Sequence, residues 1–178
     1  MKNLLLIALV LLSTISKAQE IPQLKLTPNG VESIIVEVDS ISASEIYNKA
    51  QNWVQETYKT PDKVLKANIV NEKIRVDGFV KDAWWYKSLG VTFFYNMEYT
   101  IEISFKDNRY RFEYIIGESY TEGGVKILFN YKTWYKKDGQ IKKSFSPAVP
   151  SLEETMNNLS LSFYNYVTGK SSSIDNDW

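Results

Sequence analysis

Neither cysteine nor histidine occurs in this chain of 178 residues. Without cysteine no disulfide can form, so a fold in an oxidising compartment has to be stabilised by packing alone. Without histidine there is no Ser-His-Asp or Cys-His activation of a nucleophile, no histidine general base and no histidine-containing zinc site. The groups that remain for chemistry are carboxylates, lysines, tyrosines and hydroxyls, and we expect no metal site and no cofactor.

An excess of charge of one sign is also absent, because 21 Lys and Arg residues stand against 21 Asp and Glu residues. Proteins that bind nucleic acid need a basic surface that displaces counterions from the phosphates. The balanced charge therefore predicts that nucleic acid is not a partner. Many carboxylates are present, but no two have a spacing that singles out an acid–base pair. We therefore expect a protein that is not an enzyme.

The apolar run at the N-terminus, Leu4–Leu12, spans only about half of the ~20 residues that a membrane-spanning helix needs. It follows Lys2 and precedes the small residues Ser16 and Ala18, which is typical of a secretory signal peptide cleaved after Ala18. The alternative is a retained membrane anchor. We expect residues 1–18 to be removed and the remaining chain to be exported, to the periplasm or outside the cell, with no membrane insertion after cleavage.

Residues 19–169 are enough for one domain with a substantial core. Aromatic residues make up 14% of the chain and supply bulky side chains for that core. Residues 170–178 contain serine and aspartate without hydrophobic periodicity, so we expect a flexible C-terminal tail there.

Two segments have the pattern of amphipathic helices. The first begins at a capping box formed by Ser42 and Glu45 and ends before Pro61. The second begins at a capping box formed by Ser151 and Glu154, and ends at Gly169. Each carries one apolar stripe: Ile46, Ala50, Trp53, Val54 and Thr57 in the first helix, and Leu152, Met156, Leu159, Phe163 and Tyr166 in the second.

Strands are expected at residues 31–38, 64–70, 74–80, 93–105, 110–116, 125–136 and 141–145. If Asp107 and Asn108 form a two-residue turn, the strands on either side pair so that all their apolar residues share one face. The expected pairs are Phe105–Tyr110, Ile103–Phe112, Ile101–Tyr114 and Tyr99–Ile116. A second turn at Asp138-Gly139 predicts two more pairs, Tyr135–Ile141 and Tyr131–Phe145.

The order strand, helix, four to six strands, helix predicts an α+β fold. A two-layer domain, with an antiparallel sheet of five to seven strands and both helices on one face, buries all the apolar stripes. This order, the export signal and the hairpin Lys106–Arg111 (Lys-Asp-Asn-Arg-Tyr-Arg) together resemble a family of uncharacterised exported proteins from Bacteroidota with a fold like TATA-binding protein (TBP-like). In that family glycine is usual where Asn108 stands, and asparagine also tolerates the positive φ of such a turn.

The resemblance covers Val31–Gly117 and implies a fold but no activity. DNA binding is not implied, because the fold name describes backbone topology. The element order is also similar to that of helix-grip proteins, in which a curved sheet wraps a C-terminal helix and often encloses an apolar cavity.

Three consecutive aromatic residues, Trp84, Trp85 and Tyr86, cannot all point to one face of a strand. At least one is expected to be exposed, where it could stack on a sugar ring or anchor a protein partner. The alternative, and commoner, use of such a cluster is to close one end of the core.

Four apolar residues would line a ligand cavity if the similarity to helix-grip proteins holds: Met97, Met156, Leu159 and Phe163. Their alternative role is ordinary core packing. Arg109 and Arg111 lie on the polar face of the sheet, where ion pairs with Glu102 and Glu113 are favoured over ligand recognition.

The sequence thus indicates a non-enzymatic binding module of the cell envelope, whose partner is an apolar ligand, a glycan or a protein. The alternatives are an envelope scaffold protein and, less favoured, a carboxylate-dependent hydrolase. A cavity between sheet and helix would favour a ligand carrier, and two buried acids in a cleft would favour the hydrolase.

Overall fold

The computed structural model describes residues 21–170, so the expected signal peptide and residues 171–178 of the expected tail lie outside it. Six strands form the main sheet: β3 (Ile34–Glu37), β4 (Leu65–Ile69), β5 (Lys73–Ser88), β6 (Val91–Lys106), β7 (Arg109–Thr121) and β8 (Lys126–Ile127). The sheet is antiparallel with the order β3-β7-β6-β5-β4, and β8 pairs with β7. A separate two-stranded sheet joins β1 (Leu26–Thr27) and β2 (Gly30–Val31).

The register of the β6–β7 hairpin is the one that the sequence predicts. All four expected pairs form, from Phe105 opposite Tyr110 to Tyr99 opposite Ile116. Asn108 has a φ of 63°, as the two-residue turn requires. Along the paired part of both strands, the side chains that point to the core are buried. A shift of the register by one residue would have turned these side chains to the solvent.

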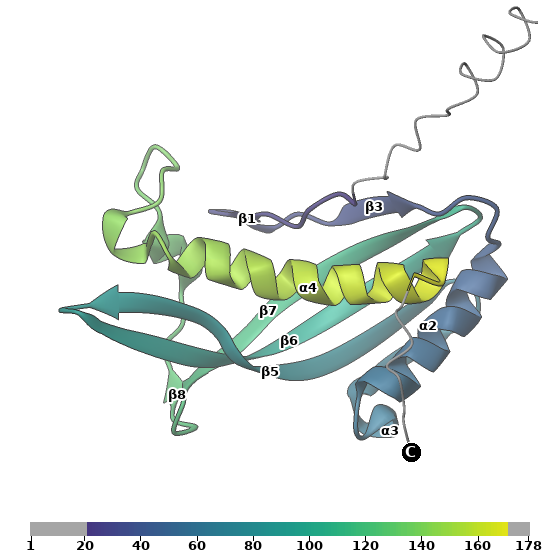
Figure 1. Cartoon of the computed structure of the whole chain (residues 1–178), viewed down its shortest axis with the longest axis horizontal. Helices are drawn as coiled ribbons and strands as arrows, with labels where there is room; N and C mark the ends of the chain where they lie inside the picture. The colour runs from purple at the N-terminus through teal and green to yellow at the C-terminus, as the bar shows by residue number, and fades with distance from the viewer. Residues whose placement is uncertain (1–20, 171–178) are drawn as a thin grey trace, which may run out of the picture.

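Both long helices, α2 (Ala43–Thr57) and α4 (Ala148–Thr168), lie on the same face of the sheet (Figure 1). A short helix, α3 (Pro61–Val64), leads from α2 into β4. Phe163 of α4 packs edge-on against Trp53 of α2 and Tyr110 of β7, with ring centroids 5.2 and 4.8 Å apart. These contacts confirm the predicted two-layer α+β architecture.

The start of α2 agrees with the sequence, and the start of α4 does not. Ser42 caps α2 by accepting a hydrogen bond from the backbone N–H of Glu45 at 3.2 Å. Ser151 was expected to cap α4, but the helix begins one turn earlier, at Ala148. The Ser151 hydroxyl instead donates to the Ala148 carbonyl and accepts the backbone N–H of Trp85. Ser151 therefore attaches α4 to the edge of β5.

The apolar stripes are buried in large part, and both helices differ from the expected sets. On α4, Leu152, Met156 and Phe163 are buried, whereas Leu159 and Tyr166 are half-buried. On α2, Ile46, Ala50, Trp53 and Val54 are buried, and Tyr47 joins them although the stripe did not include it. Thr57 was expected in the stripe and is exposed. It is the last residue of α2.

The strands expected at 125–136 and 141–145 are wrong. Only β8 forms within the first, followed by a 3₁₀ turn at Tyr131–Trp134, and a second 3₁₀ turn covers Lys143–Phe145. Tyr135 does pair with Ile141, whereas the pair of Tyr131 with Phe145 does not form. The physical reason is tertiary: Phe129 and Trp134 pack on Trp84, with ring centroids 5.5 and 4.9 Å away, and a straight strand would not bring both rings to it.

Candidate binding sites

A groove of about 320 Å³ lies between α4 and the helix-covered face of the sheet. This helix groove is lined by Val80 of β5, Tyr99 of β6 and Tyr114 of β7, and by Thr155, Asn158, Leu159 and Ser162 of α4. The strands contribute large apolar and aromatic side chains because they present their core-facing positions here. The helix contributes hydroxyl and amide groups, since its polar side begins here. The groove therefore combines an apolar interior with a polar rim.

Two stacked tyrosines from neighbouring strands form one wall of the helix groove. The ring centroids of Tyr99 and Tyr114 are 5.2 Å apart at an interplanar angle of 20°. The hydroxyls of Tyr99 and Tyr58, the residue after α2, lie 3.0 Å apart and share a hydrogen bond. Gly78 faces Tyr99 across the β5–β6 pair and leaves the space that the Tyr99 ring occupies.

The Tyr114 hydroxyl is buried and has no hydrogen-bond partner among the described residues. The large majority of buried polar groups in proteins have a partner, so this one is unusual. Burial, and secondarily the neighbouring Tyr99, raises the pKa of Tyr114. The group therefore stays protonated near neutral pH, and its O–H is available as a donor.

Of the four residues expected around a cavity, only Leu159 lines the helix groove. Met97, Met156 and Phe163 are completely buried within the core. The sequence analysis missed Tyr99 and Tyr114 as groove residues. Their placement could have been inferred from the predicted register, because that register puts both tyrosines on the core face in neighbouring pairs.

The far ends of β5 and β6 continue past a bulge between Val80 and Trp84 as a two-stranded arm, residues 84–95. In Figure 1 the arm extends beyond the N-terminal end of α4. Trp84 stacks on Tyr95 at a centroid distance of 4.2 Å, and its indole N–H donates to the Ser119 hydroxyl at 3.1 Å. Trp84 is only 3% exposed, so this member of the aromatic triplet belongs to the core.

Trp85 lies on the opposite face of the arm, directly across from Phe94, and is half-buried. The prediction that the two tryptophans point to opposite sides is confirmed. Tyr86, also half-buried, stacks on Phe93 at a centroid distance of 5.4 Å. Four apolar residues toward the tip are exposed, and Leu89 is completely so: Leu89, Val91, Phe93 and Phe94.

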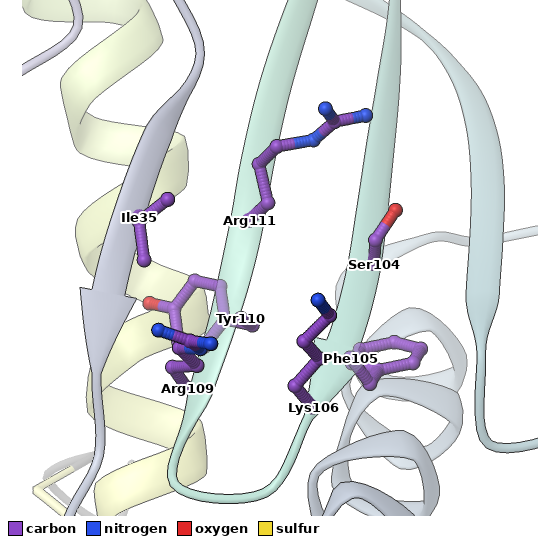
Figure 2. Close-up of a pocket in the computed structure, with 7 residues that line it drawn as sticks. All are labelled: Ile35, Ser104, Phe105, Lys106, Arg109, Tyr110 and Arg111. Carbon is purple, nitrogen blue, oxygen red and sulfur yellow. The ribbon is translucent and has the colours of Figure 1, made fainter.

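A second hollow, of about 430 Å³, lies on the face of the sheet opposite to the helices. Figure 2 shows its lining side chains: Ile35, Ser104, Lys106, Arg109 and Arg111 project outward from the sheet, while Phe105 and Tyr110 point toward the helices. We name it the sheet-face pocket. It is the alternation of the β6 and β7 side chains that separates basic residues on one side from core residues on the other.

The ion pairs expected on this face form in part. Arg111 pairs with Glu113 at 3.4 Å, as predicted. Glu102 does not pair with either arginine of the pocket and instead contacts Lys73 at 3.0 Å and Arg75 at 3.7 Å. Arg109 approaches Glu37 of β3, with 4.0 Å between the nitrogen and the oxygen.

Within residues 21–170, no group of three or more acidic side chains is arranged so that it could hold a metal ion. No helix in the same part of the chain is long and apolar enough to cross a membrane.

The sheet order and the two helices on one face define an α+β protein with a TBP-like fold. The chain is similar to solved structures with this fold. A TBP-like protein from Parabacteroides distasonis ATCC 8503 aligns with a TM-score of 0.57 at 17% identity, over 76% of this chain and 90% of that chain. A DUF4468 family protein from Bacteroides ovatus ATCC 8483 aligns with a TM-score of 0.56 at 13% identity, over 84% of this chain and 91% of that chain.

Residues 33–114 match the family model described as a domain of unknown function (DUF4468) with TBP-like fold. The resemblance to TBP-like proteins, stated from the element order, the signal-peptide pattern and the Lys106–Arg111 hairpin, is confirmed for the fold, and its expected range, Val31–Gly117, encloses the matched residues. No curated protein matches the chain. The matched segment contains all of the sheet-face pocket and the strand residues Val80, Tyr99 and Tyr114 of the helix groove, but not α4.

Proposed function

We propose that this chain is an exported, non-enzymatic binding domain that holds a small, neutral and largely apolar molecule in the helix groove. The observation that carries the proposal is Tyr114, which lines the groove and whose buried hydroxyl has no hydrogen-bond partner among the described residues. An unsatisfied buried hydroxyl costs about 1–3 kcal/mol, and a ligand with a hydrogen-bond acceptor would remove that cost.

The lining residues restrict the chemistry of the ligand. Lys, Arg, Asp and Glu are all absent from the lining of the helix groove, so a charged ligand would lose its hydration without gaining a partner. The volume of about 320 Å³ lies at the small end of ligand pockets. A compact ring system with one hydroxyl, ether or carbonyl oxygen fits these conditions, with Thr155 or Asn158 available at the rim.

Naphthol, a neutral aromatic alcohol, and naphthalene, which lacks the hydroxyl, are suitable probes for saturation-transfer NMR. Tyr114→Phe should weaken naphthol binding about tenfold, the value of one hydrogen bond, and leave naphthalene binding unchanged. Tyr120→Phe is the matched control, because the Tyr120 hydroxyl is exposed and bonded to Glu98. Leu159→Trp should fill the groove and abolish binding of both probes. Binding that survives Leu159→Trp would show that the groove is not the site.

The export part of the proposal rests on the signal-peptide pattern of residues 1–18. N-terminal sequencing of the protein released from the periplasm or the culture medium should start at Gln19. Intact residues 1–18 in a membrane fraction would contradict cleavage. Native mass spectrometry of the same material should reveal a bound molecule that Leu159→Trp does not retain.

A second candidate function is the binding of a glycan or a protein partner by the arm. It is favoured by the exposed apolar side chains near the tip, of which Leu89 is 102% and Val91 54% exposed. Exposed apolar residues that lie together mark interaction surfaces more often than scattered ones do. If neither the groove nor the arm binds a partner, an envelope scaffold remains as the function.

A further inference from the structure

The sheet-face pocket brings together three cations that the β6–β7 register places side by side. Lys106 and Arg109 are direct cross-strand partners at the turn, and Arg111 is the partner of Ser104 one step further along. Because opposite residues in an antiparallel pair project from the same face, all three charges point to the same side (Figure 2). Like charges directly opposite each other destabilise a sheet.

The surrounding carboxylates only partly compensate these charges. Glu113 is 3.4 Å from Arg111, and Glu37 lies at 4.0 Å from Arg109. In the part of the chain that the structure describes, Lys106 takes part in no ion pair. Glu102 is occupied by Lys73 and Arg75, on the β5 side of the same face.

Lys106, Arg109 and Arg111 also border a hollow large enough for a small ligand. The cations line a hollow of about 430 Å³ and are accompanied by the Ser104 hydroxyl, a further donor. The side chains of Arg109 and Arg111 are each 48% exposed, so their guanidinium groups are accessible from solvent. Ile35, which is 54% exposed, forms an apolar wall on the β3 side.

We propose that the sheet-face pocket binds the phosphate group of a small phosphomonoester, with Lys106, Arg109 and Arg111 as its cationic partners. A phosphate dianion matches three converging cations better than a carboxylate, which carries a single charge. Guanidinium groups bind phosphate oxygens in a bidentate manner, and the lysine ammonium adds a point charge. Ile35 would contact the apolar part of the ester. This site is separate from the helix groove and does not depend on the function proposed there.

The test is an amide NMR titration of the protein with phenyl phosphate, inorganic phosphate and acetate at constant ionic strength. Phenyl phosphate should shift the amides of Ser104, Lys106, Arg109 and Arg111 in a saturable manner, inorganic phosphate more weakly, and acetate negligibly. The double variant Arg109→Gln/Arg111→Gln should weaken phenyl phosphate binding at least tenfold. Arg75→Gln is the matched control, because it removes a cation from the same face but outside the pocket, and it should change binding less than twofold.

A stability measurement separates this site from a purely structural cluster. Without ligand, Lys106→Gln should raise the urea midpoint of unfolding, because it removes a like-charge pair, while it abolishes the stabilisation by phenyl phosphate. Shifts that do not saturate, or that Arg75→Gln reduces as much as the double variant, would overturn the proposal. Binding of duplex DNA that is tighter than phenyl phosphate and spreads over β4 and β5 would overturn it as well.

Discussion

Gly78 and Tyr99 face each other across the β5–β6 pair, and the aromatic ring lies over the glycine. A Cβ at position 78 would overlap the ring, its Cε2 atom being only 2.7 Å away. The absence of a side chain at Gly78 therefore sets the position of Tyr99, and through it the hydrogen bond to Tyr58 and the shape of the helix groove.

Gly78→Ala should lower the free energy of unfolding by about 1–3 kcal/mol, because Tyr99 has to leave its position and the hydrogen bond with Tyr58 breaks. Urea unfolding followed by tryptophan fluorescence measures the change. Gly123→Ala is the control, because a Cβ there would meet only the Thr121 hydroxyl at an ordinary distance of 3.8 Å, and it should change stability by less than about 0.5 kcal/mol. Equal effects of the two variants would contradict this account of Gly78.

Trp84 and Trp85, neighbours in the arm, differ in burial and therefore in the expected effect of their substitution on stability. Trp84→Ala should cost about 3–5 kcal/mol, since the residue is 3% exposed, stacks on Tyr95 and donates a hydrogen bond to Ser119. Trp85→Ala should cost clearly less, since that side chain is half-buried and lies across the arm from Phe94.

A screen of both variants against envelope glycans and proteins tests the second candidate function. Loss of binding in Trp85→Ala, at nearly unchanged stability, is expected if the arm is a binding surface. Equal destabilisation by both substitutions, with no effect on binding, would mean that the aromatic triplet only closes the core.

Among the elements, α4 joins parts of the fold that are distant in sequence. Its polar side chains bind backbone groups elsewhere: Asn157 exchanges hydrogen bonds of 2.8 and 3.0 Å with Leu24, and Thr155 donates to the Ala83 carbonyl at 2.8 Å. Through Ser151 and Thr155 the same helix binds the backbone of Trp85 and Ala83 on the edge of β5, which protects these groups from pairing with another chain. Its apolar stripe supplies much of the contact between the two layers.

Among the residues of that stripe, we expect Phe163 to contribute most to the stability of the protein. It is completely buried and contacts the rings of Trp53 and Tyr110, so Phe163→Ala should destabilise the protein by about 3 kcal/mol or more. Leu161→Ala is the matched control on the outer side of α4, where the leucine is 44% exposed. A shift below about 0.5 kcal/mol for Phe163→Ala in denaturant unfolding would mean that α4 is not packed on the sheet.

The whole molecule should lose stability at alkaline pH, because four tyrosines are deeply placed in it. Burial raises the pKa of Tyr58, Tyr99, Tyr110 and Tyr114 above the usual value of 10.0. Above pH 10 the unfolded chain releases these protons and the folded chain retains them. The unfolded state therefore binds fewer protons, and the free energy of unfolding falls by up to about 1.4 kcal/mol per pH unit for each tyrosine.

Urea unfolding at pH about 8 and pH about 11 measures this loss. The double variant Tyr110→Phe/Tyr114→Phe should show a smaller fall, because two of the four groups no longer titrate. The hydroxyls of both residues lack a hydrogen-bond partner in the described part of the chain, so the variant should not be destabilised at pH about 8. An equal fall in wild type and variant would show that other groups cause the alkaline instability.

Alternating residues and short turns were sufficient to predict the β6–β7 hairpin, from the pair of Phe105 with Tyr110 onward, and the cap of α2 at Ser42. The reason is that both depend on contacts close in sequence. Composition and periodicity also determined the α+β class, since two apolar helix stripes and a one-sided apolar sheet have few ways to be buried together.

Features that depend on contacts between residues far apart in the sequence were decided only by the tertiary structure. The segment 125–136 has the alternating pattern of a strand. In the structure Phe129 and Trp134 both pack on Trp84, and the backbone forms a 3₁₀ turn at Tyr131–Trp134 in place of a strand. Ser151 has the pattern of a helix cap, yet its hydroxyl binds the edge of β5. The helix groove arises in the same way, because its lining comes from three strands and α4, and no local pattern specifies where α4 crosses the sheet.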